Sequence, residues 1–211
     1  MSLDAIHRLP EKASHERQAL DSLLDEALYG TLCTVVDGQP WVVPMLYARD
    51  CDRILLHGST GAGALRQVAA GAPSAFSVTL VDGLVVAYST FESSAHYRSA
   101  VLRGVLVPVP GEDGRAALDL MSDRWLPGRV AEVAPMTKKE RAASLVLALP
   151  ITPGQWTLKI SAGEPDRPEL ETPVWQGVIP MQQGYGEPVR APWVPAETPI
   201  PPSVRRRLAV D

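Results

Sequence analysis

The feature that most constrains the fold is a series of short apolar runs, rich in β-branched residues and separated by turn signals, between residues 31 and 161. Asp37-Gly38 separates two of these runs, and Asp82-Gly83 separates two others. Asp-Gly favours the tight turns of β-hairpins, and apolar runs of this length are typical of strands. We therefore predict a mainly β protein of the α+β class, with a six-stranded antiparallel barrel and a few short helices.

The predicted strands include one with an unusual composition. Two consecutive hairpins are expected to give three antiparallel strands between residues 31 and 56, and the middle run contains Pro40 and Pro44. Because proline cannot donate a hydrogen bond to a ladder, this run should lie at a sheet edge or carry a bulge. Two further strands are predicted about Asp82-Gly83.

Apolar residues at helical spacing predict a helix over residues 14–28, with Ser14 as its cap and Gly30 at its end. The proline-rich last thirty residues lack apolar periodicity. We therefore predict one domain over residues 1–180 and an arm over residues 181–211, extended or packed on a partner. Shorter helices are expected over residues 62–71, 111–128 and 137–144.

Composition limits the classes of partner. The net charge of −4 and the pI of about 5.6 argue against a nucleic-acid or anionic-membrane partner. No apolar run approaches the roughly 20 residues of a transmembrane helix, and the N-terminus does not resemble a signal peptide, so a cytoplasmic protein is expected. Neither Cys33 nor Cys51 has a second ligand at zinc spacing, so no metal site is expected.

The stretch LLHGSTGAGALRQ joins an apolar run to a predicted helix through glycines and hydroxyls. Backbone N–H groups at such a helix start can bind a phosphate, and Ser59 and Thr60 add donors, although a plain capped turn is the simpler interpretation of such a stretch taken alone. Ala64 and Leu65 replace the Lys and Ser/Thr of a P-loop. Arg66 stands where the dinucleotide fingerprint requires glycine, so both named phosphate motifs are excluded.

The stretch STFESSAHYRSAVLRG is the second polar cluster. Strand alternation places Tyr97 and Ser99 on one face and Arg98 on the other. Arg98 suits a phosphate or a carboxylate, or it lies on a solvated face. No serine stands in a GxSxG elbow, which argues against a serine hydrolase. His57 and His96 are candidate flavin-site residues or structural hydrogen-bonding groups.

Several motifs occur in an order that resembles a known family: LYARDCDRILLHGSTGAGALR, VTLVDGLVVAYSTFESSAHYRSAVLRG, LPGR, LVLALPI, WTLKIS and PVWQGVIP. Together they resemble the flavin-nucleotide-binding branch of the pyridoxamine 5′-phosphate oxidase-like superfamily, which includes the nitroimidazole-resistance proteins. The resemblance covers roughly residues 20 to 180. It implies a split β-barrel that forms a homodimer and binds FMN, or in some members FAD, in two clefts between the subunits.

The resemblance also implies a set of site residues. The edge strand would line the isoalloxazine ring with backbone groups, and the glycine-rich turn would face the phosphate or ribityl chain. The Arg98-Ser99 pair would meet the cofactor across the cleft, and the Trp175-Gln176 pair would come from the other subunit. The candidate cofactor-binding residues are Val43, Pro44, Met45, Leu46, Tyr47, His57, Gly58, Ser59, Thr60, Gly61, Arg66, Tyr97, Arg98, Ser99, Trp175 and Gln176.

Two departures from the family pattern refine this expectation. Ala62 and Gly63 stand where the oxidases carry a cationic pair for the phosphate, which leaves room for FAD. The Arg-x-His run that reads pyridoxine phosphate is absent after Trp175, so vitamin B6 oxidation is not expected. We expect a flavin-dependent oxidoreductase for a small planar or aromatic substrate, with His57 as proton donor. The alternatives are a flavin-binding module without catalysis and a haem-binding protein with His57 or His96 as ligand.

Overall fold

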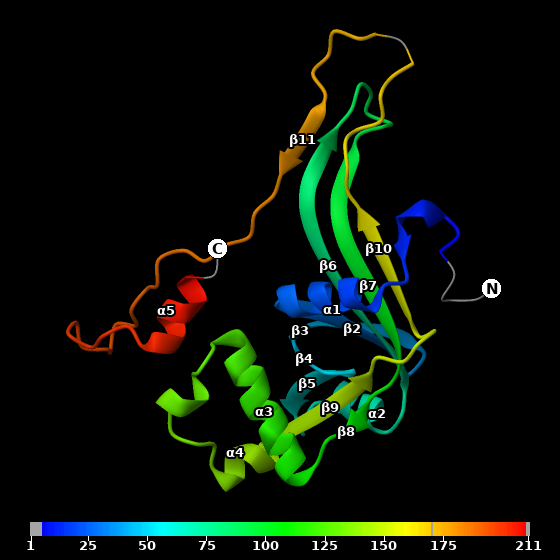
Figure 1. The fold of residues 1–211 in the computed structure, drawn as a ribbon. Helices are drawn as coiled ribbons and strands as arrows, with labels where there is room; N and C mark the ends of the chain where they lie inside the picture. Colours follow the sequence, from blue (N-terminus) through cyan, green and yellow to red (C-terminus); the bar gives the residue numbers. More distant parts are fainter. Residues whose placement is uncertain (1–5, 170, 210–211) are drawn as a thin grey trace.

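The computed structural model describes residues 6–169 and 171–209, whose strands form two antiparallel sheets (Figure 1). The larger sheet has the order β1 (Ala13–Ser14), β10 (Trp156–Ser161), β7 (Ser94–Val105), β6 (Pro73–Val86), β2 (Tyr29–Val36) and β3 (Gln39–Leu46), and β11 (Gly177–Pro180) joins the far end of β6. The smaller sheet has the order β4 (Ala48–Asp50), β5 (Arg53–Ser59), β9 (Ser144–Pro150) and β8 (Val107–Pro108). Both sheets contribute to one buried core but do not close on each other, which confirms the predicted split barrel.

Short helices surround the sheets. They are α1 (Arg17–Glu26), α2 (Gly63–Ala69), α3 (Gly111–Trp125), α4 (Lys138–Ala143) and α5 (Pro202–Leu208), with 3₁₀ turns at Pro10–Lys12 and Val130–Glu132. Among the described helices, none combines the length and apolar character needed to cross a membrane. A Thr137–Glu140 capping box begins α4.

The first helix is shorter than predicted. Ser14 pairs with Leu158 as part of β1, so it does not cap α1, and its hydroxyl accepts the Glu16 N–H at 3.3 Å. The helix ends before Ala27, and Gly30 lies within β2. Strand pairing at both ends therefore overrides the local capping signals.

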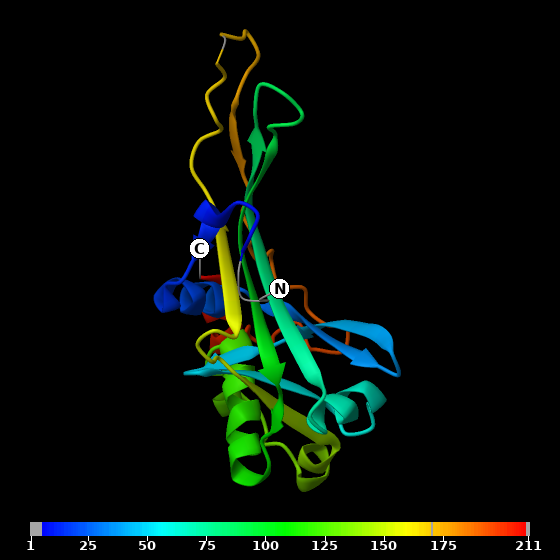
Figure 2. The same cartoon turned by 90° about the vertical axis from the view of Figure 1, so that its right-hand side faces the viewer.

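The prediction of two strands about Asp82-Gly83 is wrong. β6 runs through this pair as one strand, with a register shift between Val81 and Gly83 that marks a bulge. A Cβ at Gly83 would lie 2.9 Å from the Ile179 carbonyl oxygen, so the glycine permits the close approach of β11. The chain reverses after β6 instead, which makes the β6–β7 hairpin long and projecting (Figures 1 and 2).

The structure confirms β3 as an edge strand, but the hairpin predicted after it does not form. The chain leaves the larger sheet at Tyr47, and β5 pairs with β4 and β9. Tyr47 is fully buried: its hydroxyl donates to the Leu24 carbonyl at 2.7 Å, and its ring meets Phe76 edge-on at 5.1 Å. Its carbonyl accepts the Trp125 indole N–H at 3.1 Å, so this residue links both sheets to α1 and α3.

The C-terminal segment ends in a helix that the sequence reading did not predict. Residues 181–201 contain no helix or strand, and α5 then begins with Pro202 in its first turn. The Ser203 N–H donates to Glu132 at 2.8 Å, and the Arg207 Nε donates to the Trp125 carbonyl at 2.7 Å. These bonds hold α5 against the end of α3 in the same chain, while the division at residue 180 stays a prediction.

We expect Tyr47→Phe to lower the free energy of unfolding by about 1–2 kcal/mol, because the buried Leu24 carbonyl then loses its partner. Urea unfolding monitored by circular dichroism measures this difference. Tyr29→Phe is the matched control, since Tyr29 is 56% exposed. Equal unfolding midpoints for the two variants would show that the Tyr47 hydroxyl does not stabilise the junction.

Candidate functional site

The glycine-rich turn connects the end of β5 to the start of α2. The Ser59 Oγ accepts the Gly61 N–H at 3.1 Å, and the Ser59 carbonyl accepts the Ala62 N–H at 3.0 Å. The backbone N–H and hydroxyl of Thr60 both donate to the Ala143 carbonyl, at 3.1 and 3.4 Å. The turn is thus fixed by its own hydroxyls, and the Thr60 hydroxyl is already in use as a donor.

The start of α2 is open to a ligand. Its N-cap residue is Ala62, and no side chain caps the first turn. Gly63 is exposed, and a Cβ placed on it would meet nothing within 4 Å. Uncapped N–H groups at a helix start attract anions, and the open space at Gly63 gives an anion access to them.

Arg66 is the cation of this region. It is exposed and lines a cavity of about 410 Å³ together with Thr60, Ala69, Ala70 and Leu145. Among the described residues, no carboxylate forms an ion pair with Arg66, so its charge is available to a phosphate.

His57 lies on β5 opposite Val146, just before the glycine-rich turn. It is half-buried, and its ring centroid lies 5.8 Å from that of Trp125. Burial lowers the pKa of His57, so the imidazole is predominantly neutral at pH 7. The predicted proton-donor role of His57 therefore changes. The neutral ring can donate a hydrogen bond from one nitrogen, and its other nitrogen can accept a hydrogen bond or coordinate a metal.

The edge strand β3 presents the predicted residues in two ways. Pro44 and Leu46 are exposed on one face, while Val43 and Met45 pack against the core on the other. In the part of the chain that the structure describes, the strand pairs with β2 alone, so its outer backbone edge is open to a ligand. Tyr47 differs, because its hydroxyl, ring and carbonyl are all engaged within the fold.

Arg98 is held by two carboxylates. Its guanidinium contacts Asp82 at 2.9 and 2.7 Å and Glu26 at 2.8 Å, and it lowers the pKa of both acids. Its positive charge is therefore balanced within the chain. Tyr97 and Ser99 lie on the opposite face of β7, half-buried, as strand alternation requires.

Trp175 and Gln176 lie far from the glycine-rich turn within one chain. They precede β11, which pairs with β6 near the projecting end of the β6–β7 hairpin, whereas α2 lies at the other end of β6 (Figures 1 and 2). Trp175 is 64% exposed. A single chain thus contains two separate sets of candidate residues. The turn set comprises Val43–Tyr47, His57–Gly61 and Arg66, and the hairpin set comprises Tyr97–Ser99, Trp175 and Gln176.

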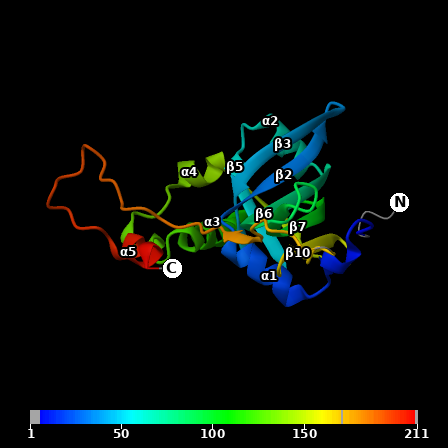
Figure 3. The ribbon, with the colours of Figure 1, turned by 90° about the horizontal axis from the view of Figure 1, so that it is seen from above.

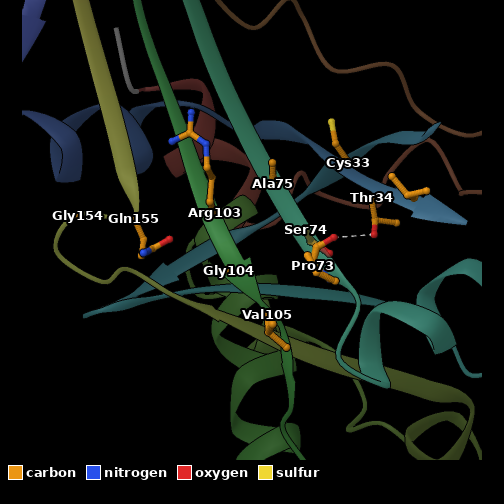
Figure 4. A pocket seen from close by; sticks show the side chains of 11 residues that line it. Cys33, Thr34, Pro73, Ser74, Ala75, Arg103, Gly104, Val105, Gly154 and Gln155 are labelled. Atoms are coloured by element: carbon orange, nitrogen blue, oxygen red, sulfur yellow. Dashed lines mark hydrogen bonds between the residues drawn. The ribbon is translucent and has the colours of Figure 1, made fainter. Parts of the chain in front are cut away.

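A groove of about 800 Å³ crosses the larger sheet next to these elements (Figure 4). Sequence reasoning missed it, because its residues come from the three strands β2, β6 and β7 and from the loop before β10, which meet only in the fold. The alternation of β7 does place Arg103 on the same face as Ser99. The residues that line the groove are Cys33, Thr34, Val35, Pro73, Ser74, Ala75, Arg103, Gly104, Val105, Gly154 and Gln155.

In the described part of the chain, no group of three or more His, Cys, Asp or Glu side chains could hold a metal ion.

We expect Arg98→Met to destabilise the protein at pH 7 and much less at pH 3. The lowered pKa values of Glu26 and Asp82 mean that their ion pairs contribute stability above the ordinary carboxyl pKa values and lose it as the pH falls through the lowered values. The difference in unfolding free energy between wild type and variant should therefore shrink on acidification. Arg115→Met on α3 is the control, and a difference that does not change with pH would contradict this account of Arg98.

None of the curated proteins matches the chain. The FAD and haem binding protein from Mycobacterium smegmatis is 46% identical and superposes with a TM-score of 0.91, over 93% of this chain and 97% of that chain. Flavocytochrome Anf3 from Azotobacter vinelandii is 26% identical with a TM-score of 0.89, over 97% of this chain and 95% of that chain. The sequence model of the pyridoxamine 5′-phosphate oxidase family matches residues 16–157. The chain therefore belongs to the pyridoxamine 5′-phosphate oxidase family.

Proposed function

We propose that the chain is a flavoprotein that binds FAD between the two subunits of a homodimer. The observation that carries this proposal is the uncapped, open start of α2 beside the cation Arg66. Backbone N–H groups, Arg66 and the Ser59 hydroxyl would hold a flavin phosphate there, and the free edge of β3 would face the ring. The 46% identical relative that binds FAD and haem supports the same conclusion.

The residues favour FAD over FMN. Ala62 and Gly63 provide no charged clamp for a terminal phosphate, and Arg98 is already balanced by Glu26 and Asp82. The diphosphate of FAD continues into an adenosine, which needs space at the phosphate end. This space is open at Gly63, because even a Cβ placed on this residue would meet no atom within 4 Å.

A homodimer explains why the turn set and the hairpin set are apart. The projecting hairpin and β11 carry exposed apolar side chains, with Phe91 90%, Leu84 48% and Ile179 50% exposed. Apolar surface of this kind marks an interface. In a two-fold dimer, the hairpin set of one subunit, including Ser99 and Trp175, would complete the turn set of the other.

A bound flavin would supply hydride or single-electron transfer. The chain would orient the ring with the edge of β3, shield it with Trp175 of the hairpin set, and place the neutral His57 for hydrogen bonding. We propose a reductase for a small planar or aromatic substrate, because the indole of Trp125 lies beside His57 and the side chains of Leu46 and Trp175 are exposed.

Haem binding is a second candidate function, favoured by His57. A neutral imidazole is the form that coordinates iron, and His57 is neutral, half-buried and beside the indole of Trp125. Two similar structures are those of a haem-binding protein and a flavocytochrome. We propose that His57 would ligate the haem iron.

Gly63→Asp and Trp175→Ala test the shared site together. Each should weaken flavin binding about tenfold or more as a homodimer: the first because a carboxylate repels the phosphate at an open position, the second because the ring loses its partner. Gly63→Ala is the matched control and should bind as wild type. A heterodimer of one Gly63→Asp subunit and one Trp175→Ala subunit can be purified with two different tags. It has one intact site and should bind one flavin tightly, as measured by fluorescence quenching.

A heterodimer that binds no better than either homodimer would contradict a site shared between subunits. Tight binding by the Trp175→Ala homodimer would remove the hairpin set from the site.

The absorption spectrum of purified protein reconstituted with haem tests the second function. A Soret band should form in the wild type and in His96→Ala, and it should be lost or strongly shifted in His57→Ala. A wild type without a Soret band would exclude haem binding, and an unchanged band in His57→Ala would exclude His57 as the ligand.

A further inference from the structure

A cavity of about 290 Å³, here named the α5 cavity, lies between the C-terminal segment and the end of α3, against which α5 packs (Figure 1). An apolar cavity of about 150 Å³ can hold one benzene molecule, so a cavity of this size has room for a planar molecule of one or two rings. Most of its lining residues are apolar, and they include Leu28, Leu46, Trp125, Leu126, Val204 and Leu208.

The α5 cavity adjoins the turn set. Leu46 lines it and is the last residue of β3, the edge strand that would face the flavin ring. Trp125 also lines it, and the ring centroid of this residue lies 5.8 Å from that of His57. A ligand in the cavity would therefore lie at the end of the edge strand and one aromatic ring away from His57.

Among the described residues, Arg207 is the only charged one that lines the α5 cavity. Its Nε donates to the Trp125 carbonyl at 2.7 Å, and its Nη2 donates to the Arg124 carbonyl at 3.1 Å. Both acceptors are uncharged, and no carboxylate in the described part of the chain forms an ion pair with Arg207. Its positive charge therefore has no balancing partner there, in contrast to that of Arg98.

Arg207 also has N–H groups left for a ligand. A guanidinium has five N–H donors, and the two bonds to carbonyls leave three. The buried side-chain nitrogens without a partner among the described residues belong to Arg103 and Arg124. The Nη1 of Arg207 has no partner in the same part of the chain and is not one of these buried atoms, so it is accessible to a ligand.

Tyr185 holds this guanidinium in place. Its ring lies against Arg207, with the Cζ atom 5.2 Å from the ring centroid. This cation–π contact and the two bonds to carbonyls restrict the rotation of a long side chain. Because the donor is already oriented, little further side-chain entropy is lost when a ligand binds.

The α5 cavity thus combines apolar walls with one unbalanced guanidinium. A carboxylate has two oxygens that match the fork of a guanidinium, and the pair is stronger where the walls keep water away. The apolar walls favour an aromatic ring over a sugar or a second charged group, which would lose its hydration there. A small planar aromatic acid satisfies both requirements.

We propose that the α5 cavity binds a small planar aromatic acid, with its carboxylate on Arg207 and its ring against Trp125 and Leu46. The identification of this acid as the substrate rests on the proposed reductase function, whereas the binding itself does not. Arg207 is then the residue that selects an acid over an uncharged molecule of the same shape.

Calorimetric titration of purified protein with cinnamate and cinnamamide tests this proposal. Cinnamate is a planar aromatic acid, and cinnamamide has nearly the same shape without the charge. The wild type should bind cinnamate about tenfold or more tightly than cinnamamide. Arg207→Met should weaken cinnamate binding about tenfold and change cinnamamide binding less than about twofold. Arg207→Lys keeps the charge without the fork, so its preference for cinnamate should be intermediate.

Arg206→Met is the matched control. The Arg206 Nε donates to the Pro127 carbonyl at 2.9 Å, so Arg206 also holds α5 but does not line the cavity. This variant should keep the wild-type preference for cinnamate. An equal loss of cinnamate and cinnamamide binding in Arg207→Met would assign Arg207 to holding α5 and overturn the proposal.

Val204→Trp tests the position of the ligand. Val204 lines the cavity, and an indole would fill it, so both ligands should bind about tenfold more weakly or worse. Val189→Trp is the control, because Val189 is 95% exposed, and it should bind as wild type.

Two outcomes would overturn the proposal while flavin binding stands. The wild type could bind neither ligand, or Val204→Trp could bind both as well as the wild type does. A wild type that binds cinnamate with the expected preference but binds no flavin would support the acid site and reject the proposed flavin function.

Discussion

The three contacts of Tyr47 hold the two halves of this fold in register. Its hydroxyl bonds to the Leu24 carbonyl of α1, its ring packs on Phe76 of the larger sheet, and its carbonyl accepts the indole N–H of Trp125 from α3. Burial raises its pKa, so the hydroxyl stays a donor at neutral pH. Because the chain passes from β3 into the smaller sheet here, these contacts fix the edge strand relative to β5. They also fix Trp125, whose ring lies against His57.

Charge around the candidate site is distributed in an unusual way for a phosphate ligand. The guanidinium of Arg98 is balanced by two carboxylates, and the helix start beside the glycine-rich turn carries no cation in its first turn. Arg66 along α2 remains as a cation near this helix start. Its charge and the open backbone N–H groups would bind a flavin phosphate in place of the clamp that is missing at Ala62 and Gly63 (Figure 3 shows β3, β5 and α2 from above).

Local sequence signals predicted the features that local physics determines. Pro40 and Pro44 indicated an edge strand because they cannot donate a hydrogen bond to a ladder. Thr137 and Glu140 form a helix cap in which each residue bonds only to the other. Features that depend on distant residues were missed. Asp82-Gly83 is a typical turn pair, yet β11 packs on it and keeps it extended, and the groove across the larger sheet requires three strands and a loop to assemble. The family resemblance supplied the flavin hypothesis that spacing alone left open.

Identification of the flavin released from purified protein is the most direct measurement. Acid-released cofactor from protein expressed with its natural flavins is separated by liquid chromatography and identified by mass spectrometry. The proposed site, an open helix start beside Arg66 with no charged clamp at Ala62 and Gly63, predicts FAD, at close to one molecule per chain in a two-fold dimer. Protein that carries only FMN would contradict the proposal of FAD. Protein that carries no flavin and takes up none on reconstitution would contradict flavin binding itself.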